Sequence, residues 1–143
     1  MKARKVEHIG IAVRSIEESL PLWRDVLGLH HEGTETVAGM KVKVARLRAG
    51  ETVIELIEPL EGEEPTRKFL EKRGEGIHHI CLEVEDLAGA GRDLAARGIT
   101  PLYPAPRAGS GGSLVNFLLP KQTHGVLVEL NELPPEPMGP ERS

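Results

Sequence analysis

The chain has 143 residues, of which 39% are hydrophobic and 28% charged, with a formal net charge of −4. These values are typical of a globular protein, and an acidic balance without any basic cluster argues against nucleic acid as a partner. The sequence has no apolar run long enough to cross a membrane, no signal-peptide core and only one cysteine, so we expect a cytoplasmic protein without membrane contact or disulfides.

The hydrophobic pattern divides the chain into two similar units. Alternating apolar and polar residues are typical of half-buried strands. In the first unit, about residues 5–60, they predict strands at 6–13, 41–47 and 52–57. In the second unit, about residues 76–131, the same pattern predicts strands at 77–84, near 99–103, at 114–118 and at 125–130. With one helix after the first strand, each unit is expected to be β-α-β-β-β, and three of these four strands are located in the first unit.

Each predicted helix has a polar residue at its start and a glycine at its end. Ser15 and Gly28 are suited to begin and end the first helix. Pro21 lies inside it and predicts a late start or a kink. In the second unit, Asp86 and Gly98 occupy the corresponding places.

A connector and a tail complete the predicted organisation. The connector is expected to be a short helix at 65–73, because a proline stands at its first position and Gly74 follows it. Residues 1–133 are predicted to form a single domain. The stretch 134–143 is rich in proline and is predicted to be a flexible tail.

The two units repeat a histidine and a glutamate at equivalent places. His8 and His79 stand in the first strands, and Glu55 and Glu129 in the last strands. Because alternate residues of a strand face opposite sides of the sheet, all four side chains are expected on the face that the helices leave open. A single strand histidine or glutamate is more often hydrogen-bonded or solvated. The repeated placement nevertheless brings two imidazoles and two carboxylates together, and we interpret the set as a metal site.

The neighbours of these residues carry expectations of their own. Gly10 and Ala12 are expected to leave room on the open face for a ligand. By the same alternation, His78 is predicted to face the helices as a structural residue. Cys81 is predicted to be a small buried residue and not a nucleophile.

Several motifs resemble those of a known family. The general ones are His8–Val13 and Arg24–Leu29, and the more specific ones are Ile54–Leu60, Lys68–Ile80, Pro106–Gly112 and Pro120–Leu130. With these motifs the chain, from residue 5 to 133, resembles the methylmalonyl-CoA epimerases of the vicinal oxygen chelate superfamily.

The resemblance implies an α+β fold, in which two tandem βαβββ modules form a curled eight-stranded mixed sheet with helices on its outer face. It implies one divalent ion (Co, Mn, Ni, Zn or Mg) bound by His8, Glu55, His79 and Glu129. The implied reaction interconverts the C2 epimers of methylmalonyl-CoA by 1,1-proton transfer through a metal-stabilised enolate. The implied partners are an acyl-CoA substrate and a second copy of the chain in a homodimer.

Two positions depart from the family pattern. Val42 stands where some members have a glutamate that acts as a base, and Leu119 replaces a histidine. The catalytic role of base is therefore assigned to Glu129 and Glu55.

A glycine-rich segment and a lysine are the candidates for substrate binding. By itself the segment at 109–113 predicts a flexible hairpin loop. With the resemblance, the backbone of Gly111 and Gly112 is predicted to contact the substrate. Lys121, and Arg107 as a further candidate, are predicted to contact coenzyme A phosphates, although a solvated lysine is the plain alternative.

Other functions are compatible with parts of this pattern. A glyoxalase I-like lactoylglutathione lyase can use the same fold and ligand set, but the connector motif favours the epimerase. A non-catalytic small-molecule binding protein of the superfamily needs no metal, and the full ligand set disfavours it. An extradiol dioxygenase normally has one carboxylate ligand, so the second glutamate argues against it.

Overall fold

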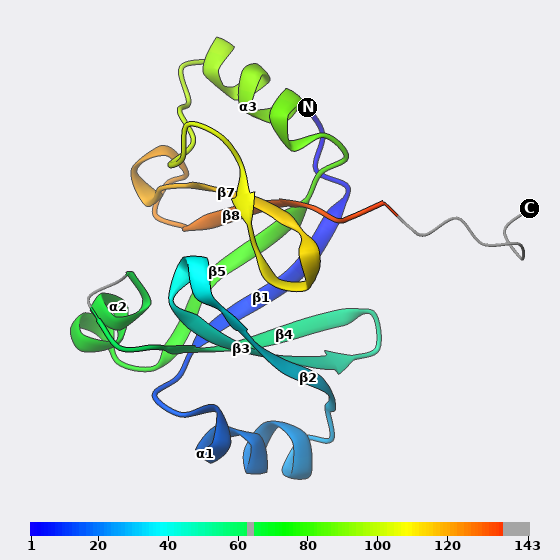
Figure 1. The fold of residues 1–143 in the computed structure, drawn as a ribbon, viewed down its shortest axis with the longest axis vertical. Helices are drawn as coiled ribbons and strands as arrows, with labels where there is room; N and C mark the ends of the chain where they lie inside the picture. Colours follow the sequence, from blue (N-terminus) through cyan, green and yellow to red (C-terminus); the bar gives the residue numbers. More distant parts are fainter. Residues whose placement is uncertain (63–64, 136–143) are drawn as a thin grey trace, which may run out of the picture.

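The centre of the molecule is one curled sheet of eight strands, and the computed structural model describes residues 1–62 and 65–135 (Figure 1). The strands are β1 (Lys5–Ala12), β2 (His30–Val37), β3 (Val42–Ala49), β4 (Thr52–Pro59), β5 (Gly76–Glu83), β6 (Arg107–Ala108), β7 (Leu114–Leu118) and β8 (Val128–Glu132). Their order across the sheet is β2-β3-β4-β1-β5-β8-β7-β6. β1 runs parallel to β4 and β5 parallel to β8, while the other pairs are antiparallel. The predicted α+β fold with a mixed eight-stranded sheet is confirmed.

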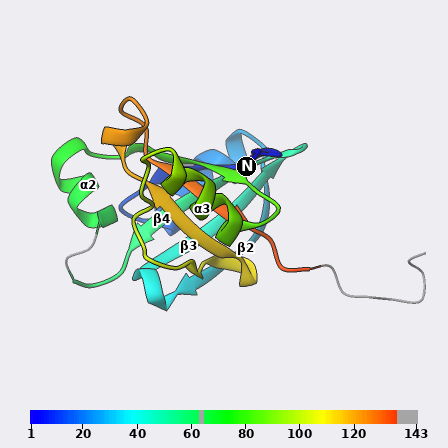
Figure 2. The same ribbon diagram turned by 90° about the horizontal axis from the view of Figure 1, so that it is seen from above.

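Helices lie outside this sheet. The first is α1 (Ile16–Leu20), which continues as the π-helical turn η1 (Pro21–Val26); the others are α2 (Pro65–Arg73) and α3 (Leu87–Ala96). Three single 3-10 turns are η2 (Ala38–Met40), η3 (Ser110–Gly112) and η4 (Pro120–Gln122). α1 and α3 lie at opposite ends of the long axis with the strands between them (Figure 1). Figure 2 shows α3 over the sheet and α2 off to one side. Among the described residues, no helix is long and apolar enough to cross a membrane.

The helix signals in the sequence are confirmed. The Ser15 side chain accepts a hydrogen bond from the Glu18 N–H, and the Asp86 side chain accepts one from the Gly89 N–H, so both are N-caps. At Pro21 the first helix changes from α to π geometry, which is the predicted irregularity. The connector helix has the predicted bounds, 65–73.

Each half of the sheet has its own hydrophobic core beneath its helix. The core of the first half consists of Val13, Ile16, Ala45, Leu47 and Leu56. The core of the second half consists of Val84, Leu87, Ala90, Leu94, Leu118, Val128 and Leu130. These are the faces that strand alternation assigned to the helices. The other face of each half is not covered by its helix, and we call it the inner face. The two halves join where β1 pairs with β5.

The prediction of a strand near residues 99–103 is wrong. Three prolines within 101–106 lack the N–H that a sheet ladder requires. The segment runs beside β7 instead, and the Asn116 side chain accepts from the Tyr103 N–H and donates to the Tyr103 carbonyl, both at 3.0 Å. The outer strand of this half is the two-residue β6. The predicted tail at 134–143 lies outside the described residues from 136 onward.

Candidate metal centre

The four predicted ligands converge at the junction of β1 and β5. His8 Nε2 lies 3.0 Å from His79 Nε2, 3.2 Å from Glu55 Oε1 and 3.1 Å from Glu129 Oε1. His79 Nε2 lies 2.8 Å from the same Glu129 oxygen. All four residues are at most 8% exposed. The structure therefore brings together one imidazole and one carboxylate from each half of the sheet.

The backbone of Gly10 makes this convergence possible. Gly10 pairs with Glu55 on β4 and with His79 on β5, so it lies between two of the four residues. A Cβ on Gly10 would stand 2.5 Å from Nδ1 of His79, and closer still to another ring atom. The space over Gly10 is thus filled by the His79 ring. The expectation that Gly10 leaves room for a ligand is wrong, because the His79 side chain occupies that space.

The donor set fits a divalent metal ion. Imidazole nitrogen and carboxylate oxygen bind such ions at about 2.0–2.2 Å, and donors bound to one ion at about right angles stand about 3 Å apart. The spacings here are 2.8 to 3.2 Å. His8, His79 and Glu129 each offer one atom within 4.8 Å of the others, and Glu55 adjoins this group through His8.

The charges of the cluster also favour a cation. Burial alone would lower the pKa of His8, but hydrogen bonds to Cys81, Glu129 and Glu7 raise it to about 12. Burial alone would raise the pKa of Glu129, but hydrogen bonds from His79 and His8 lower it to about 2. Burial raises the pKa of Glu55. Without a metal ion, the cluster holds a proton on His8, and a divalent ion would replace this positive charge.

Two β-bulges place further residues on the inner face. The register between β1 and β5 shifts at Glu7 and again at His78, the residues that precede the two site histidines. Glu7 Oε1 accepts from His8 Nδ1 at 2.6 Å, and His78 Nδ1 lies 3.0 Å from His79 Nδ1. The prediction that His78 faces the helices is wrong, because a bulge shifts the alternation by one residue. Alternation alone could not reveal either bulge.

His78 is neutral in this environment. Burial and the charge of His79 lower its pKa to about 4. Its ring meets Phe69 of α2 edge-on, with 4.9 Å between the ring centres. The connector helix therefore supports the site through His78. Cys81, as predicted, is fully buried, and burial raises its pKa to about 12, which excludes a thiolate nucleophile.

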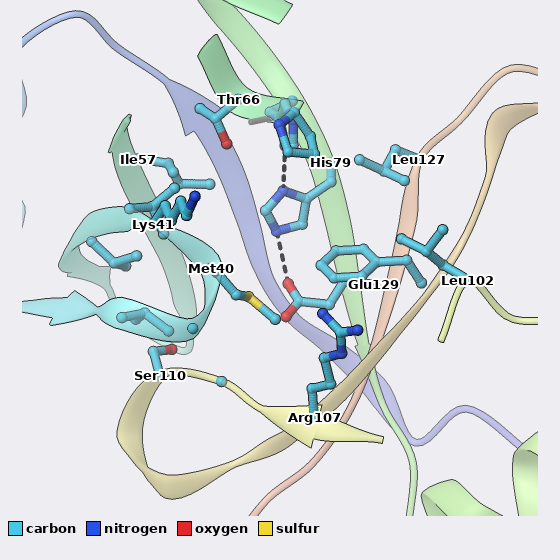
Figure 3. Close-up of a pocket in the computed structure, with 18 of the residues that line it drawn as sticks. Met40, Lys41, Ile57, Thr66, His79, Leu102, Arg107, Ser110, Leu127 and Glu129 are labelled. Atoms are coloured by element: carbon cyan, nitrogen blue, oxygen red, sulfur yellow. Dashed lines mark hydrogen bonds and ion pairs between the residues drawn. The ribbon is translucent and has the colours of Figure 1, made fainter. Parts of the chain in front are cut away.

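A pocket of about 380 Å³ opens beside the centre (Figure 3). Glu55, His78, His79 and Glu129 form part of its wall. Much of the remaining wall is apolar and includes Val37, Val42, Val44, Ile57, Leu102, Phe117, Leu119 and Leu127. Both departures from the family pattern, Val42 and Leu119, are thus part of the pocket. Hydrophobic walls with a few convergent polar groups are typical of small-molecule sites.

Two cations stand at this pocket. Arg107 lines it, and its guanidinium carbon lies 3.8 Å from the centre of the Tyr103 ring. Lys41 lines it as well, from a residue with a φ of 56° at the end of η2. Sequence analysis did not single out Lys41. A lysine that follows a glycine and a methionine matches no motif that would mark it as a binding residue.

The other predicted substrate contacts lie differently. Gly111 donates its N–H to Glu35 Oε1 at 2.7 Å, so this group is already engaged. Within the described residues, the pocket wall includes the adjacent Gly109 and Ser110, but not Gly111, Gly112 or Lys121.

Comparison with known proteins assigns this arrangement to a family. The family model described as the Glyoxalase/Bleomycin resistance protein/Dioxygenase superfamily matches residues 7–117. The chain belongs to this superfamily. Enzymes of the superfamily bind a metal, and the cluster described above offers suitable ligands.

Several relatives within the superfamily have a named activity. The chain is 39% identical to a mitochondrial methylmalonyl-CoA epimerase of Dictyostelium discoideum, over 90% of this chain and 78% of the relative. It is 37% identical to an ethylmalonyl-CoA/methylmalonyl-CoA epimerase of Cereibacter sphaeroides, over 90% of this chain and 98% of the relative. A methylmalonyl-CoA epimerase of Streptomyces coelicolor in complex with 2-nitronate-propionyl-CoA has a similar structure, with a TM-score of 0.89 and 33% identity over 94% of this chain and all of that one.

Proposed function

We propose that this protein is a metal-dependent epimerase that interconverts the C2 epimers of methylmalonyl-CoA. The observation that carries the proposal is the convergence of His8, His79, Glu55 and Glu129 beside an apolar pocket. Relatives and similar structures that are named methylmalonyl-CoA epimerases support the choice of substrate.

The four clustered residues are the proposed ligands of one divalent ion. When bound, this ion would act as a Lewis acid on the thioester carbonyl and lower the cost of removing the C2 proton. The two imidazoles and two carboxylates suit Co, Mn, Ni, Zn or Mg. The four groups come from β1, β4, β5 and β8.

Proton transfer is assigned to the two glutamates. Glu55 reaches the pocket from β4 and Glu129 from β8, which belong to opposite halves of the sheet. A substrate held between them has a carboxylate on each face, as a 1,1-proton transfer requires. Glu129 is the proposed principal base. Val42 and Val44 form part of the pocket wall. Because these side chains are apolar, they shield C2 from water and cannot act as bases.

The cations at the pocket match an anionic substrate. Methylmalonyl-CoA carries a free carboxylate and phosphates. Lys41 and Arg107 line the pocket, and the packing of Arg107 on Tyr103 restricts its movement. We propose that these two residues attract the anionic groups, whereas Lys121 is exposed and does not line the pocket.

Deuterium exchange distinguishes this function from its nearest rival. Methylmalonyl-CoA is incubated with the protein in D₂O, and deuterium at C2 is measured by mass spectrometry. The same preparation is assayed with the hemithioacetal of glutathione and methylglyoxal. We expect exchange at C2 and no lyase activity. Lyase activity without exchange would instead establish the glyoxalase I-like function.

A histidine pair provides the matched control. His79→Ala is expected to abolish exchange and to lower the bound metal sharply, because it removes one of two imidazoles. His30→Ala, at an exposed histidine of β2, is expected to keep both. Full metal content and activity in the His79→Ala variant would refute the proposed site.

A further inference from the structure

The two halves of the sheet hold their site residues in different ways. The register partner of Glu55 on the neighbouring strand is Arg46, and the register partner of Glu129 is Phe117. Likewise, the bulged residue before the site histidine is Glu7 in the first half and His78 in the second. The first half therefore has a carboxylate and a guanidinium where the second half has an imidazole and a phenyl ring.

Glu7 and Arg46 link the two site residues of the first half. Glu7 Oε1 lies 2.6 Å from Nδ1 of His8, and its Oε2 accepts from Arg46 Nη2 at 3.0 Å. Arg46 Nη1 donates to Glu55 Oε2 at 2.6 Å. Glu7 is 6% exposed and Glu55 is 3% exposed, while the Arg46 side chain is 26% exposed, so the carboxylate ends of these contacts are buried. A continuous path of hydrogen bonds thus joins His8 to Glu55 around the outside of the site.

The directions of these bonds determine which atoms face the centre. A carboxylate can only accept a hydrogen bond, so the Nδ1 of His8 must carry the proton that Glu7 accepts. The other ring nitrogen of His8, Nε2, therefore faces the other three residues of the site. Arg46 holds Oε2 of Glu55, and the other oxygen, Oε1, is the one that faces His8 Nε2.

We propose that Glu7 and Arg46 are positioning residues, which fix His8 to bind metal through Nε2 and fix Glu55 to bind through Oε1. This inference rests on the proposed metal site. Glu129 has Phe117 in the place of Arg46, and an aromatic ring cannot clamp a carboxylate. The two ligands of the first half are therefore linked to each other by hydrogen bonds outside the site, whereas Glu129 has no such clamp from the neighbouring strand.

Zn²⁺ affinity and histidine NMR test the role of Glu7. Glu7→Met removes the acceptor at nearly constant length, and Glu7→Gln keeps an acceptor oxygen but loses the charge. Loss of a hydrogen-bonded partner of a ligand histidine typically lowers metal affinity about 10–100-fold. We expect such a loss for Glu7→Met and a smaller one for Glu7→Gln, measured by competition with a chromophoric chelator. Nitrogen-15 NMR of the Zn²⁺-bound protein is expected to show His8 bound through Nε2 alone in the unaltered protein and a mixture of Nε2 and Nδ1 binding in Glu7→Met.

A second pair of variants tests Arg46. Arg46→Lys keeps the charge but replaces the two nitrogens that donate to Glu55 and Glu7 with a single one, and we expect Zn²⁺ affinity to fall about tenfold. The control is Glu32→Gln, which removes a carboxylate 3.8 Å from Arg46 on the side away from the site. This control is expected to stay within about twofold of the unaltered protein. Because Arg46→Lys preserves the charge, it gives an answer even if Glu7→Met does not fold.

The outcomes separate this inference from the proposed function. If the unaltered protein binds Zn²⁺ and the Glu7 and Arg46 variants bind it equally well, the positioning role is refuted and the proposed function stands. If the unaltered protein binds none of Zn²⁺, Co²⁺, Ni²⁺, Mn²⁺ and Mg²⁺, both are refuted. An ordered loss, largest for Glu7→Met and absent for Glu32→Gln, supports the inference.

Discussion

Glu129 contacts both imidazoles of the cluster. Its Oε1 lies within 3.1 Å of both imidazoles, and the residue also forms part of the pocket wall (Figure 3). Hydrogen bonds from these imidazoles outweigh its burial and lower its pKa to about 2. The low pKa keeps this carboxylate ionised but also makes it a weaker base, so its proposed role depends on its position, from which it can accept a proton over a short distance.

The proposed role of Glu129 predicts the behaviour of one variant. Glu129→Gln keeps an oxygen that can bind metal but cannot accept the C2 proton. We expect this variant to retain much of its metal and to lose C2 exchange by about 10²–10⁴-fold, the usual contribution of a general base. Metal content and exchange are measured on the same sample. A fully metallated variant that exchanges at nearly the unaltered rate would show that Glu129 is a ligand only.

Gly10 predicts a steric effect on the same centre. In Gly10→Ala the new methyl group would collide with the His79 ring and push it out of line. We expect Zn²⁺ affinity to fall at least about tenfold, as when a ligand loses its orientation. Gly76→Ala is the control, because it also lies on a strand and its new Cβ would meet nothing within 4 Å. Equal affinities in the two variants would contradict the close packing over Gly10.

At the scale of elements, the sequence predicted most of what positions the site. Alternation placed His8, His79, Glu55 and Glu129 on one face, and the repeat predicted that they meet. It could not predict the bulge that turns His78 inward, because a bulge depends on pairing between strands and not on the residues of one strand. For the same reason, nothing in the sequence pointed to Glu7 or Arg46, whose roles depend on register.

The failed strand near 99–103 has a different cause. Its apolar residues follow a strand-like pattern, but the nearby prolines lack the N–H groups that a regular strand would use to pair with its neighbour. The side chain of Asn116 instead binds the backbone N–H and carbonyl of Tyr103.

Asn116 therefore predicts a local effect on stability. Asn116→Ala would leave the Tyr103 N–H, the Tyr103 carbonyl and the Phe117 N–H without this partner. We expect the free energy of unfolding to fall by about 3 kcal/mol, the cost of three lost hydrogen bonds, as measured by urea denaturation. Asn131→Ala is the control, since its buried Oδ1 accepts no hydrogen bond from the described residues. A larger loss for Asn131→Ala than for Asn116→Ala would contradict this account of the segment.

At the scale of the whole molecule, the two halves are complementary. Each has its own core and covering helix, and they meet along β1 and β5. Neither half alone carries more than one imidazole and one carboxylate of the cluster. The centre thus exists only where the duplicated unit is joined to its copy.

The homodimer remains a prediction at this scale. Apolar side chains on the outer surface of the first helix, including Leu22, Val26 and Leu27, are at least half exposed, and such surfaces are often covered by a partner. We expect light scattering to give a mass of twice the 15.6 kDa of one chain at micromolar concentration. A mass of 15.6 kDa would contradict a dimer.

The most direct test of a metal centre shared by both halves is C2 exchange during removal and return of the ion. The protein is treated with a chelator, dialysed, and titrated with Co²⁺ or Zn²⁺, while deuterium incorporation into methylmalonyl-CoA is followed. We predict that exchange stops on chelation and returns in full at one equivalent of metal per chain. Undiminished exchange in the protein shown to be free of metal would contradict the account.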